Sequence, residues 1–452
     1  MIQTFVNAWK VPELRKKILF TLMVILLYRI GANLIIPYVD VKAMEQTNQA
    51  FSDGIFGLLT MMSGGAFSQA TFFALSVSPY ITASIVIQLL SIAIPALEKL
   101  SKDPDGQKKL SSATRWVTVG LAIVTAFGYV NLLNSYNLLS ITATPVTGSA
   151  KHVMPWIVMI ACLCAGASLI MWLAEKINEY GIGNGISIIL FANIISGLTR
   201  YVQGAIGMLF EGGDISMGWR TGWDLVLGIA LCILSVVLSL AAIVFIVWFT
   251  NSERRIKVIY AKRVVGRKTY GGQKTNLPLK MNMAGVMPVI FASSIVSIPA
   301  MIAQFVLSAK PESKFAEGVN NWFGADTAIY FIIFVALIVA FSYFYIAISF
   351  NPVEVANNIR SNGGAIIGIR PQEMAPFIKK ILNRVTLMGA IFLVVIAGVP
   401  IIAGAIASML EINFTSLAFA GTSLLIAVGV ALEIVRDLEA QLSMRNYKGF
   451  LD

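Results

Sequence analysis

We predict from the sequence an all-α polytopic membrane protein with ten transmembrane helices, and three observations support this prediction. Hydrophobic residues make up 57% of the 452 residues and charged residues only 13%, whereas about a quarter of the residues in a soluble domain are charged. The chain contains ten apolar runs near the roughly 20 residues that a helix needs to cross a membrane. Lysine and arginine residues gather in alternate loops between these runs.

The predicted spans also set an orientation. They cover residues 18–38, 72–94, 116–138, 153–173, 186–202, 225–249, 286–307, 328–350, 381–402 and 416–435. Ten is an even number, so both chain ends lie on one side, and that side holds 27 of the 34 lysine and arginine residues. Because basic residues are enriched in cytoplasmic loops, we predict that both termini are cytoplasmic. Arg29 lies inside the first span, where we expect it to face a wet interior or a carbonyl of a neighbouring helix.

Two predicted cytoplasmic loops, 251–280 and 351–380, are unusually long and basic. The first carries nine basic residues within thirty positions. Orientation in the membrane explains part of this charge. The excess also fits a docking surface for an anionic partner, which could be RNA or an acidic protein surface.

The chain lacks the residues that most membrane enzymes and pumps need. His152 is the only histidine, and the sequence has no Gly-rich phosphate-binding loop of the G-x-x-x-x-G-K-[ST] type. Cys162, Cys164 and Cys232 fall inside spans without metal-site spacing. We therefore predict no enzymatic activity, no cofactor and no metal. An ion-coupled transporter of a small solute stays open as the alternative, although the predicted spans have few of the carboxylates that such proteins use.

A short apolar segment precedes the second span. Its apolar part, from Ile55 to Met62, extends only about 12 Å as a helix and cannot cross a membrane. Backbone at membrane depth that does not span must be buried in protein or line a watery cavity. We predict a re-entrant helix hinged at Gly64 and Gly65. An amphipathic helix on the outer surface is the other interpretation.

Two short patterns recur five spans apart. Residues 79–84 read Pro-Tyr-Ile-Thr-Ala-Ser and residues 288–293 read Pro-Val-Ile-Phe-Ala-Ser. Residues 185–190 read Gly-Ile-Ser-Ile-Ile-Leu and residues 421–426 read Gly-Thr-Ser-Leu-Leu-Ile. The members of each pair run in opposite directions through the membrane. Inverted repeats place a functional site near the midplane, between the halves. We predict two inverted five-helix halves, residues 1–202 and 203–452, around a central pore.

Several stretches resemble the SecY/Sec61 family of protein-conducting channels over essentially the whole chain. They are residues 54–88, 181–186 (Gly-Ile-Gly-Asn-Gly-Ile), 278–288 (Pro-Leu-Lys-Met-Asn-Met-Ala-Gly-Val-Met-Pro), 368–371 (Gly-Ile-Arg-Pro) and 421–426. The resemblance implies a channel that passes unfolded secretory polypeptides across the bacterial plasma membrane. It also implies that transmembrane segments leave sideways into lipid through a lateral gate.

The resemblance assigns roles to residues of this chain. The implied pore ring consists of Ile81, Ile85, Ile186, Leu190, Ile290 and Ile426. The implied plug, residues 55–65, includes Ile55, Phe56, Leu58, Leu59, Met61, Met62, Gly64 and Gly65. The implied lateral gate includes Pro79, Gln88, Pro288 and Ser294. The implied cytoplasmic docking residues are Arg254, Arg255, Lys262, Arg263 and Arg370.

The resemblance also implies partners. These are the subunits SecE and SecG, the ATPase SecA, the ribosome, signal sequences, unfolded preproteins and the lipid bilayer. Energy would come from SecA or the ribosome, because the chain itself has no nucleotide-binding motif.

Overall fold

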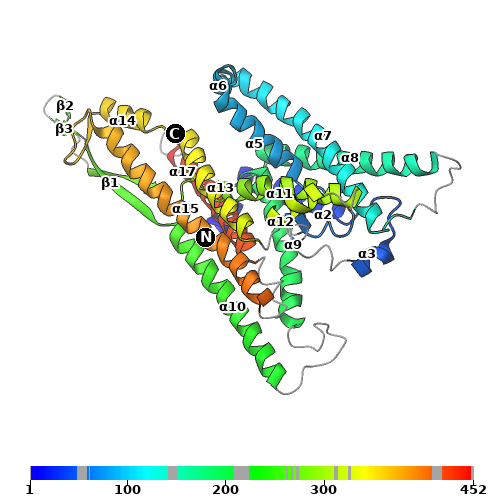
Figure 1. The fold of residues 1–452 in the computed structure, drawn as a ribbon. Helices are drawn as coiled ribbons and strands as arrows, with labels where there is room; N and C mark the ends of the chain where they lie inside the picture. The colour runs from blue at the N-terminus through cyan, green and yellow to red at the C-terminus, as the bar shows by residue number, and fades with distance from the viewer. Residues whose placement is uncertain are drawn as a thin grey trace.

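A computed structural model describes residues 2–47, 57, 59–60, 62–140, 150–207, 223–260, 263–265, 268–270, 274–309, 314–323, 327–409 and 420–448. Helices dominate this part of the chain (Figure 1). The helices are α1 (Ile2–Lys10), α2 (Pro12–Gly31), α3 (Val41–Thr47), α5 (Ser78–Ala93), α6 (Pro95–Lys102), α7 (Pro104–Ser135), α8 (Ala150–Tyr180), α9 (Gly185–Gly207), α10 (Trp223–Thr250), α11 (Met287–Ala309), α12 (Lys314–Phe323), α13 (Ala328–Ser349), α14 (Pro352–Ser361), α15 (Met374–Met409) and α17 (Ala420–Lys448). The strands are β1 (Glu253–Tyr260), β2 (Arg263–Val265), β3 (Lys268–Tyr270), β4 (Lys274–Lys280) and β5 (Gly364–Ile366).

Among the described residues, five helical segments are long and apolar enough to cross a membrane, or six if one bent pair counts as a span. They are Asp105–Ser135, Val153–Tyr180, Met287–Leu307, Ile329–Ser361 and Met374–Val399, with the bent pair Ser78–Ala93 and Pro95–Ser101. Two other predicted spans contain shorter apolar helices, Gly185–Gly197 and Val236–Thr250. A multi-span helical protein is thus confirmed, and the number ten stays a prediction.

The second predicted span differs from the expected straight helix. Helix α5 begins at Ser78 rather than at residue 72, because turns occupy the chain before it and Ser76 has a left-handed backbone with φ 50°. At its other end the chain bends by 112° into α6. Ile94 is extended there and Pro95 opens α6, which is the conformation that a following proline favours.

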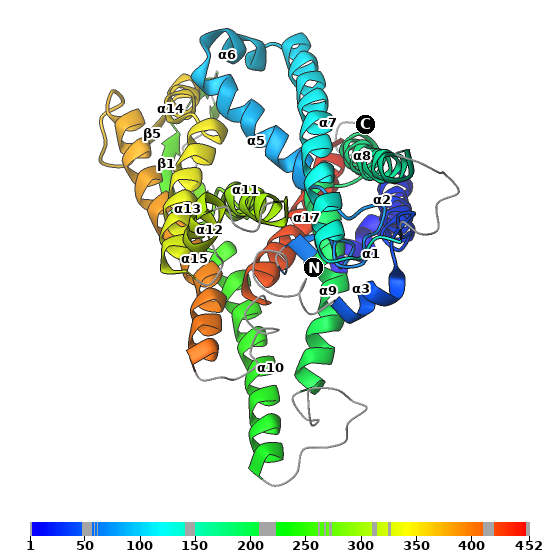
Figure 2. The ribbon, with the colours of Figure 1, turned by 45° about the vertical axis from the view of Figure 1, so that its right-hand side comes forward.

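Two groups of helices lie on either side of α11 and α17. Figures 1 and 2 show α10, α13, α14 and α15 on one side and α2, α5, α6, α7 and α8 on the other. Helix α11 packs against α7 and α5 on one side and α13 on the other, while α17 packs against α9, α10 and α15. The largest hydrophobic cluster extends across both groups, from Val24 in α2 to Val430 in α17. The groups therefore share one core.

The two basic loops form a small sheet, although they were expected to be loops without strands. Its strand order is β4-β1-β5, with antiparallel pairing throughout. The register pairs Glu253 with Lys280 and Val258 with Ile366. Alternate side chains of β1, Ile256 and Val258, are buried in a cluster with apolar residues of α14 and α15. The period-two alternation in Arg-Ile-Lys-Val was a strand signal within a segment that we expected to be a loop.

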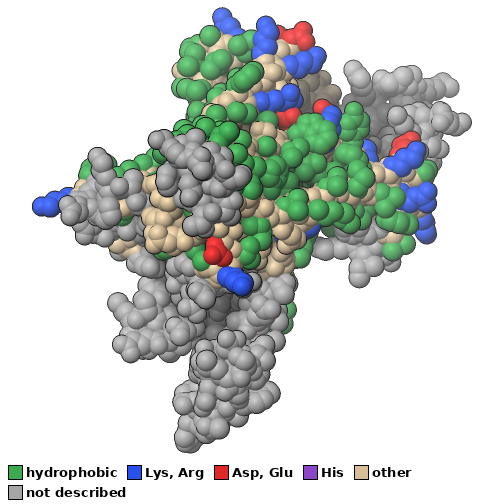
Figure 3. Space-filling view, turned by 90° about the vertical axis from the view of Figure 1, so that its right-hand side faces the viewer, with side chains coloured by type: hydrophobic (Ala, Val, Ile, Leu, Met, Phe, Trp, Pro, Cys, Tyr) green, Lys and Arg blue, Asp and Glu red, His purple; other side chains and the backbone are tan. Residues whose placement is uncertain are grey.

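Much of the surface is apolar, as a lipid-facing protein requires. Figure 3 shows hydrophobic side chains across a broad area of one face, with most of the charged side chains toward the top and right of the view. Leu26 in α2 and Val244 and Trp248 in α10 are each at least 60% exposed. Exposed apolar area of this extent is unfavourable in water and favourable in hydrocarbon.

A close approach of two backbones gives a stability prediction. A Cβ atom on Gly166 of α8 would lie 2.0 Å from the carbonyl oxygen of Phe72, whereas a Cβ atom on Gly120 of α7 would meet nothing within 4 Å. We expect Gly166→Ala to lower the free energy of unfolding by about 1–3 kcal/mol, the usual cost of overpacking. Gly120→Ala is the matched control and should be neutral or stabilising by up to about 1 kcal/mol. Unfolding of both variants in detergent, followed by tryptophan fluorescence, checks this, and equal stability would contradict it.

Candidate functional site

The six side chains of the predicted pore ring belong to one hydrophobic cluster. They come from α5, α9, α11 and α17, which are far apart in the sequence. Five of the six are at most 8% exposed, and Ile186 is partly buried against the same cluster. The members are Ile81, Ile85, Ile186, Leu190, Ile290 and Ile426. All six lie within the first eight residues of their helices, so the beginnings of four helices contribute to this part of the core.

Local sequence explains why the helices begin there. Proline stands at the second position of both α5 and α11, where its missing N–H costs nothing and its fixed φ fits a helix. At the start of α9, the N–H of Gly185 donates to Asn178 Oδ1 at 2.7 Å and the N–H of Ile186 donates to Asn184 Oδ1 at 3.0 Å. Such side-chain caps satisfy helix N–H groups that have no partner in the helix.

The recurring sequence patterns fall in pairs of helices that touch. Helix α5 packs against α11, and α9 packs against α17. These are the pairs that carry the Pro-x-Ile-x-Ala-Ser and Gly-x-Ser patterns. The four predicted gate residues lie on the first pair. Pro79, Pro288 and Ser294 are buried, and the half-buried Gln88 donates from Nε2 to Ser84 Oγ at 3.2 Å.

The predicted plug is described only in part. Ile55, Phe56, Leu58 and Met61 lie outside the described residues. Leu59 is buried in the second hydrophobic cluster, and Met62 packs against the first. Gly64 and Gly65 have φ values of 65° and 95°, in the left-handed region that glycine adopts without strain.

The chain between Met62 and α5 is a compact series of turns held from three directions. Ile36 N donates to Ala70 O at 3.0 Å, and Phe72 N donates to Leu34 O at 2.7 Å. From α7, the fully buried Tyr129 donates its hydroxyl to Phe67 O at 2.5 Å. From α9, Asn193 Nδ2 donates to Met62 O at 2.8 Å.

Neither Tyr129 nor Asn193 was predicted in this role. The signal for Asn193 was an amide inside a predicted apolar span, which is uncommon and indicates a specific partner.

Arg29 was expected to face either a wet interior or a carbonyl of a neighbouring helix, and the second expectation is confirmed. Its Nη2 donates to the carbonyl of Ala192, on the neighbouring helix α9. The contacts of Arg29 and Asn193 both join α9 to the N-terminal part of the chain.

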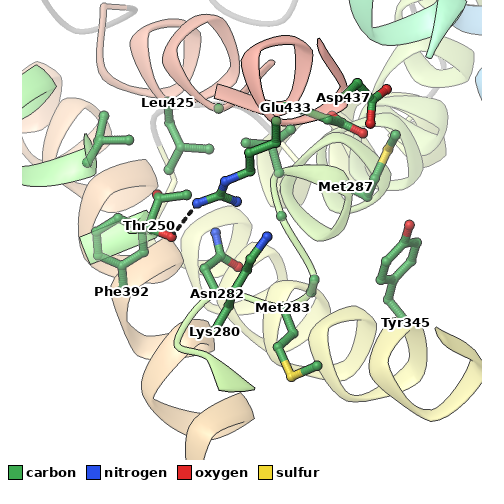
Figure 4. A pocket seen from close by; sticks show the side chains of 16 residues that line it. Thr250, Lys280, Asn282, Met283, Met287, Tyr345, Phe392, Leu425, Glu433 and Asp437 are labelled. Atoms are coloured by element: carbon green, nitrogen blue, oxygen red, sulfur yellow. Dashed lines mark hydrogen bonds between the residues drawn. The ribbon is translucent and has the colours of Figure 1, made fainter. Parts of the chain in front are cut away.

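A polar cavity lies beside the predicted ring. Its volume is about 250 Å³, and its lining includes Val286, Met287 and Leu425, sequence neighbours of the ring. Figure 4 shows Lys280 and Asn282 on one side of it and Glu433 and Asp437 on the other. Charged groups of both signs thus line a cavity that the apolar cluster also lines, through Val286 and Leu425.

Arg436 anchors this cavity to the end of α10. Its guanidinium donates to Thr250 O at 2.8 Å and to Asn251 Oδ1 at 2.9 Å. Burial lowers the pKa of Lys280 at the end of β4, and the positive charge of Arg436 lowers it further, while Glu253 acts in the opposite direction.

Three of the five predicted docking residues lie on or shortly after strands of the β4-β1-β5 sheet. Arg254 and Arg255 are exposed at the start of β1, and Arg370 is exposed four residues after β5. Strand β5 runs antiparallel to β1, pairing Gly364 with Tyr260 and Ile366 with Val258, and a turn at residues 367–369 separates it from Arg370. Lys262 lies outside the described residues, and the side chain of Arg263, in β2, is not described.

The pair of Arg436 and Lys280 gives a prediction on charge. We expect Arg436→Gln to raise the pKa of Lys280 toward its ordinary value, because a positive neighbour is removed and burial alone remains to disfavour the ammonium. The measurement is the pH dependence of acetylation at Lys280, read by mass spectrometry. Arg15→Gln, which removes the same charge from an exposed position on α2, should leave the midpoint unchanged. An unshifted midpoint in Arg436→Gln would contradict the coupling.

Comparisons with known proteins identify the family. Residues 71–435 match the family model described as SecY. A protein translocase subunit SecY of Streptomyces galbus is 42% identical over 461 residues, covering 100% of both chains.

Solved structures show the same fold at lower identity. A SecY structure described for a plug domain that stabilises the closed state of the translocation channel has a TM-score of 0.60 and 17% identity, covering 96% of both chains. Sec61 in the canine ribosome–channel complex of the endoplasmic reticulum has a TM-score of 0.60 and 16% identity, also covering 96% of both chains. Full-length relatives, a matching family model and this fold together show that the chain belongs to the SecY family.

Proposed function

We infer that the chain is the protein-conducting channel subunit of a Sec translocase, a pore without enzymatic activity of its own. One observation supports the proposed mechanism of the pore. Six aliphatic side chains from four helices share one core cluster, and the helices that bear them touch in pairs. Membership of the SecY family decides between a channel and the ion-coupled transporter that the inverted patterns alone would also allow.

The proposed pore ring seals by being narrow and apolar. Such a constriction loses its water, and ions meet a barrier without a covalent gate. Aliphatic side chains have no hydrogen-bonding groups, so a passing polypeptide of any sequence leaves no unpaired polar atom on the ring. The ring would therefore admit an extended chain while excluding ions.

The proposed lateral gate is the contact between α5 and α11. When these helices part, a signal sequence or a nascent transmembrane helix would leave sideways into lipid, driven by burial of its apolar surface. We propose that residues 55–65 close the channel as a plug. In the related SecY structure the plug domain stabilises the closed state and maintains a membrane seal.

The proposed arrangement in the membrane has ten spans in two inverted halves, 1–202 and 203–452, with both termini cytoplasmic in the bacterial plasma membrane. The basic loops would then lie in the cytoplasm. There the sheet of β4, β1 and β5 would bind SecA or the ribosome, and a related Sec61 is part of a ribosome–channel complex. SecE and SecG would complete the assembly.

The ring gives the first functional prediction. Ile81→Asn and Ile290→Asn should each raise ion leak through reconstituted channels and increase transport of preproteins with defective signal sequences, because an amide holds water in the constriction. A barrier lower by about 1.4 kcal/mol raises flux about tenfold. Ile290→Leu, which keeps the side chain apolar, is the control. If both asparagine variants leak no more than this control, the ring lies elsewhere.

The proposed docking surface gives the second functional prediction. Arg370→Glu should lower SecA-driven preprotein transport and ribosome binding by roughly fivefold, the size of a loss of about 1 kcal/mol in surface charge pairing. Arg360→Glu makes the same change at another exposed position, on α14, and should have a smaller effect. Transport into vesicles and ribosome cosedimentation measure this. Normal values for Arg370→Glu, with the protein folded and inserted, would place docking elsewhere.

A further inference from the structure

A buried amide on α9 contacts the end of the plug segment. Asn193 is fully buried, and its neighbours Ile189, Leu190 and Ile194 on α9 belong to the apolar cluster or pack against it. Its Nδ2 donates to Met62 O at 2.8 Å and to Ser76 Oγ at 3.3 Å. The hydroxyl of Ser76 donates to Met62 O as well, at 3.2 Å. A single backbone carbonyl of the plug segment therefore receives two side-chain donors.

This contact lies between the glycine hinge, about which the plug would move, and the chain that enters α5. Met62, within the plug segment, is separated from the hinge glycines Gly64 and Gly65 only by Ser63. A Cβ atom on Gly64 would lie 3.1 Å from the backbone of Asn193, so the hinge rests directly on this residue. Ser76 stands two residues before α5 and has a φ of 50°, an uncommon backbone for a residue other than glycine. The contact thus joins the hinge, α9 and the entrance to α5.

Burial makes this contact depend on the position of the plug. An amide inside an apolar cluster is stable only while it is hydrogen-bonded. If residues 55–65 moved away and carried Met62 with them, Asn193 would lose its nearer acceptor. Leu190 of the proposed ring lies three residues earlier on the same helix, on the same face. The contact is therefore next to the constriction that the plug would cover.

We propose that Asn193 and Ser76 form a latch that holds the plug in its seated position and thereby sets how strong a signal sequence must be to open the channel. The inference rests on the proposed function, because it presumes that residues 55–65 are a plug. It assigns the positioning of that plug to side chains of α9 and of the chain before α5. Neither residue was among the predicted site residues.

The test compares variants that keep the fold. Asn193→Leu replaces the amide with an apolar group of similar size, which leaves no unpaired amide in the core. Ser76→Ala removes the second donor. The matched control is Asn131→Leu, which also removes an amide that donates to a distant carbonyl, that of Phe305 in α11 at 3.3 Å, and Asn131 has no hydrogen bond to the described residues of the plug segment. All variants are full-length chains reconstituted with their partner subunits.

We expect Asn193→Leu to increase transport of a preprotein with a defective signal sequence roughly tenfold, which corresponds to about 1.4 kcal/mol. Ser76→Ala should have a smaller effect, and the double variant should have the largest.

A second measurement follows the position of the plug itself, in a chain whose three native cysteines are replaced by alanine. A water-soluble maleimide should label Leu59→Cys faster when Asn193→Leu is also present. Asn131→Leu should change neither measurement.

A plug deletion separates this inference from the function on which it rests. If deletion of residues 55–61 raises ion leak but Asn193→Leu changes neither transport nor labelling, the latch is wrong and the plug stands. If neither deletion nor substitution has any effect, the plug and the latch both fail. If Asn131→Leu has the same effect as Asn193→Leu, the amide only supports the fold, and the latch is overturned.

Discussion

The non-helical chain between Met62 and Ser78 is the feature on which the rest of the site depends. Backbone groups inside a membrane protein cannot turn to water, so they must find partners in protein or in a wet cavity. Here the partners come from Leu34 and Ile36 in the chain that follows α2, from Tyr129 on α7 and from Asn193 on α9. Because these elements hold the turns, α5 begins deep in the protein with Ile81 and Ile85 buried.

The same constraint separates apolar and polar surfaces within a short distance. Where helices begin, side chains such as Asn178 and Asn184 satisfy the free N–H groups of α9, and the residues that follow are free to be aliphatic. The cavity next to these aliphatic residues is lined by Lys280, Glu433 and Asp437, among others. An apolar cluster bordered by a polar vestibule suits the passage of unfolded polypeptide, which has both apolar and polar parts and favours neither surface alone.

Helix α9 connects these features. It supplies two residues of the proposed ring, an acceptor carbonyl for Arg29 and the amide that contacts the plug segment. It also packs against α17, which carries Ile426 and whose Arg436 donates to Thr250 O and Asn251 Oδ1 at the end of α10. Through this pair, the helix that contacts the proposed plug segment is joined to the end of α10, which precedes β1.

The sequence by itself determined the membrane class and the apolar spans, and it offered a neighbouring carbonyl as one of two settings for Arg29. These follow from hydropathy and from the cost of a charge in an apolar setting, which are local properties. The residues of the core cluster were named from the resemblance to the SecY/Sec61 family. Tertiary structure alone decided where α5 starts, how two basic loops join as β4-β1-β5, and which carbonyl Asn193 contacts. Turns and polar contacts of this kind depend on partners that lie tens of residues to more than a hundred residues away, and neither composition nor periodicity contains that pairing.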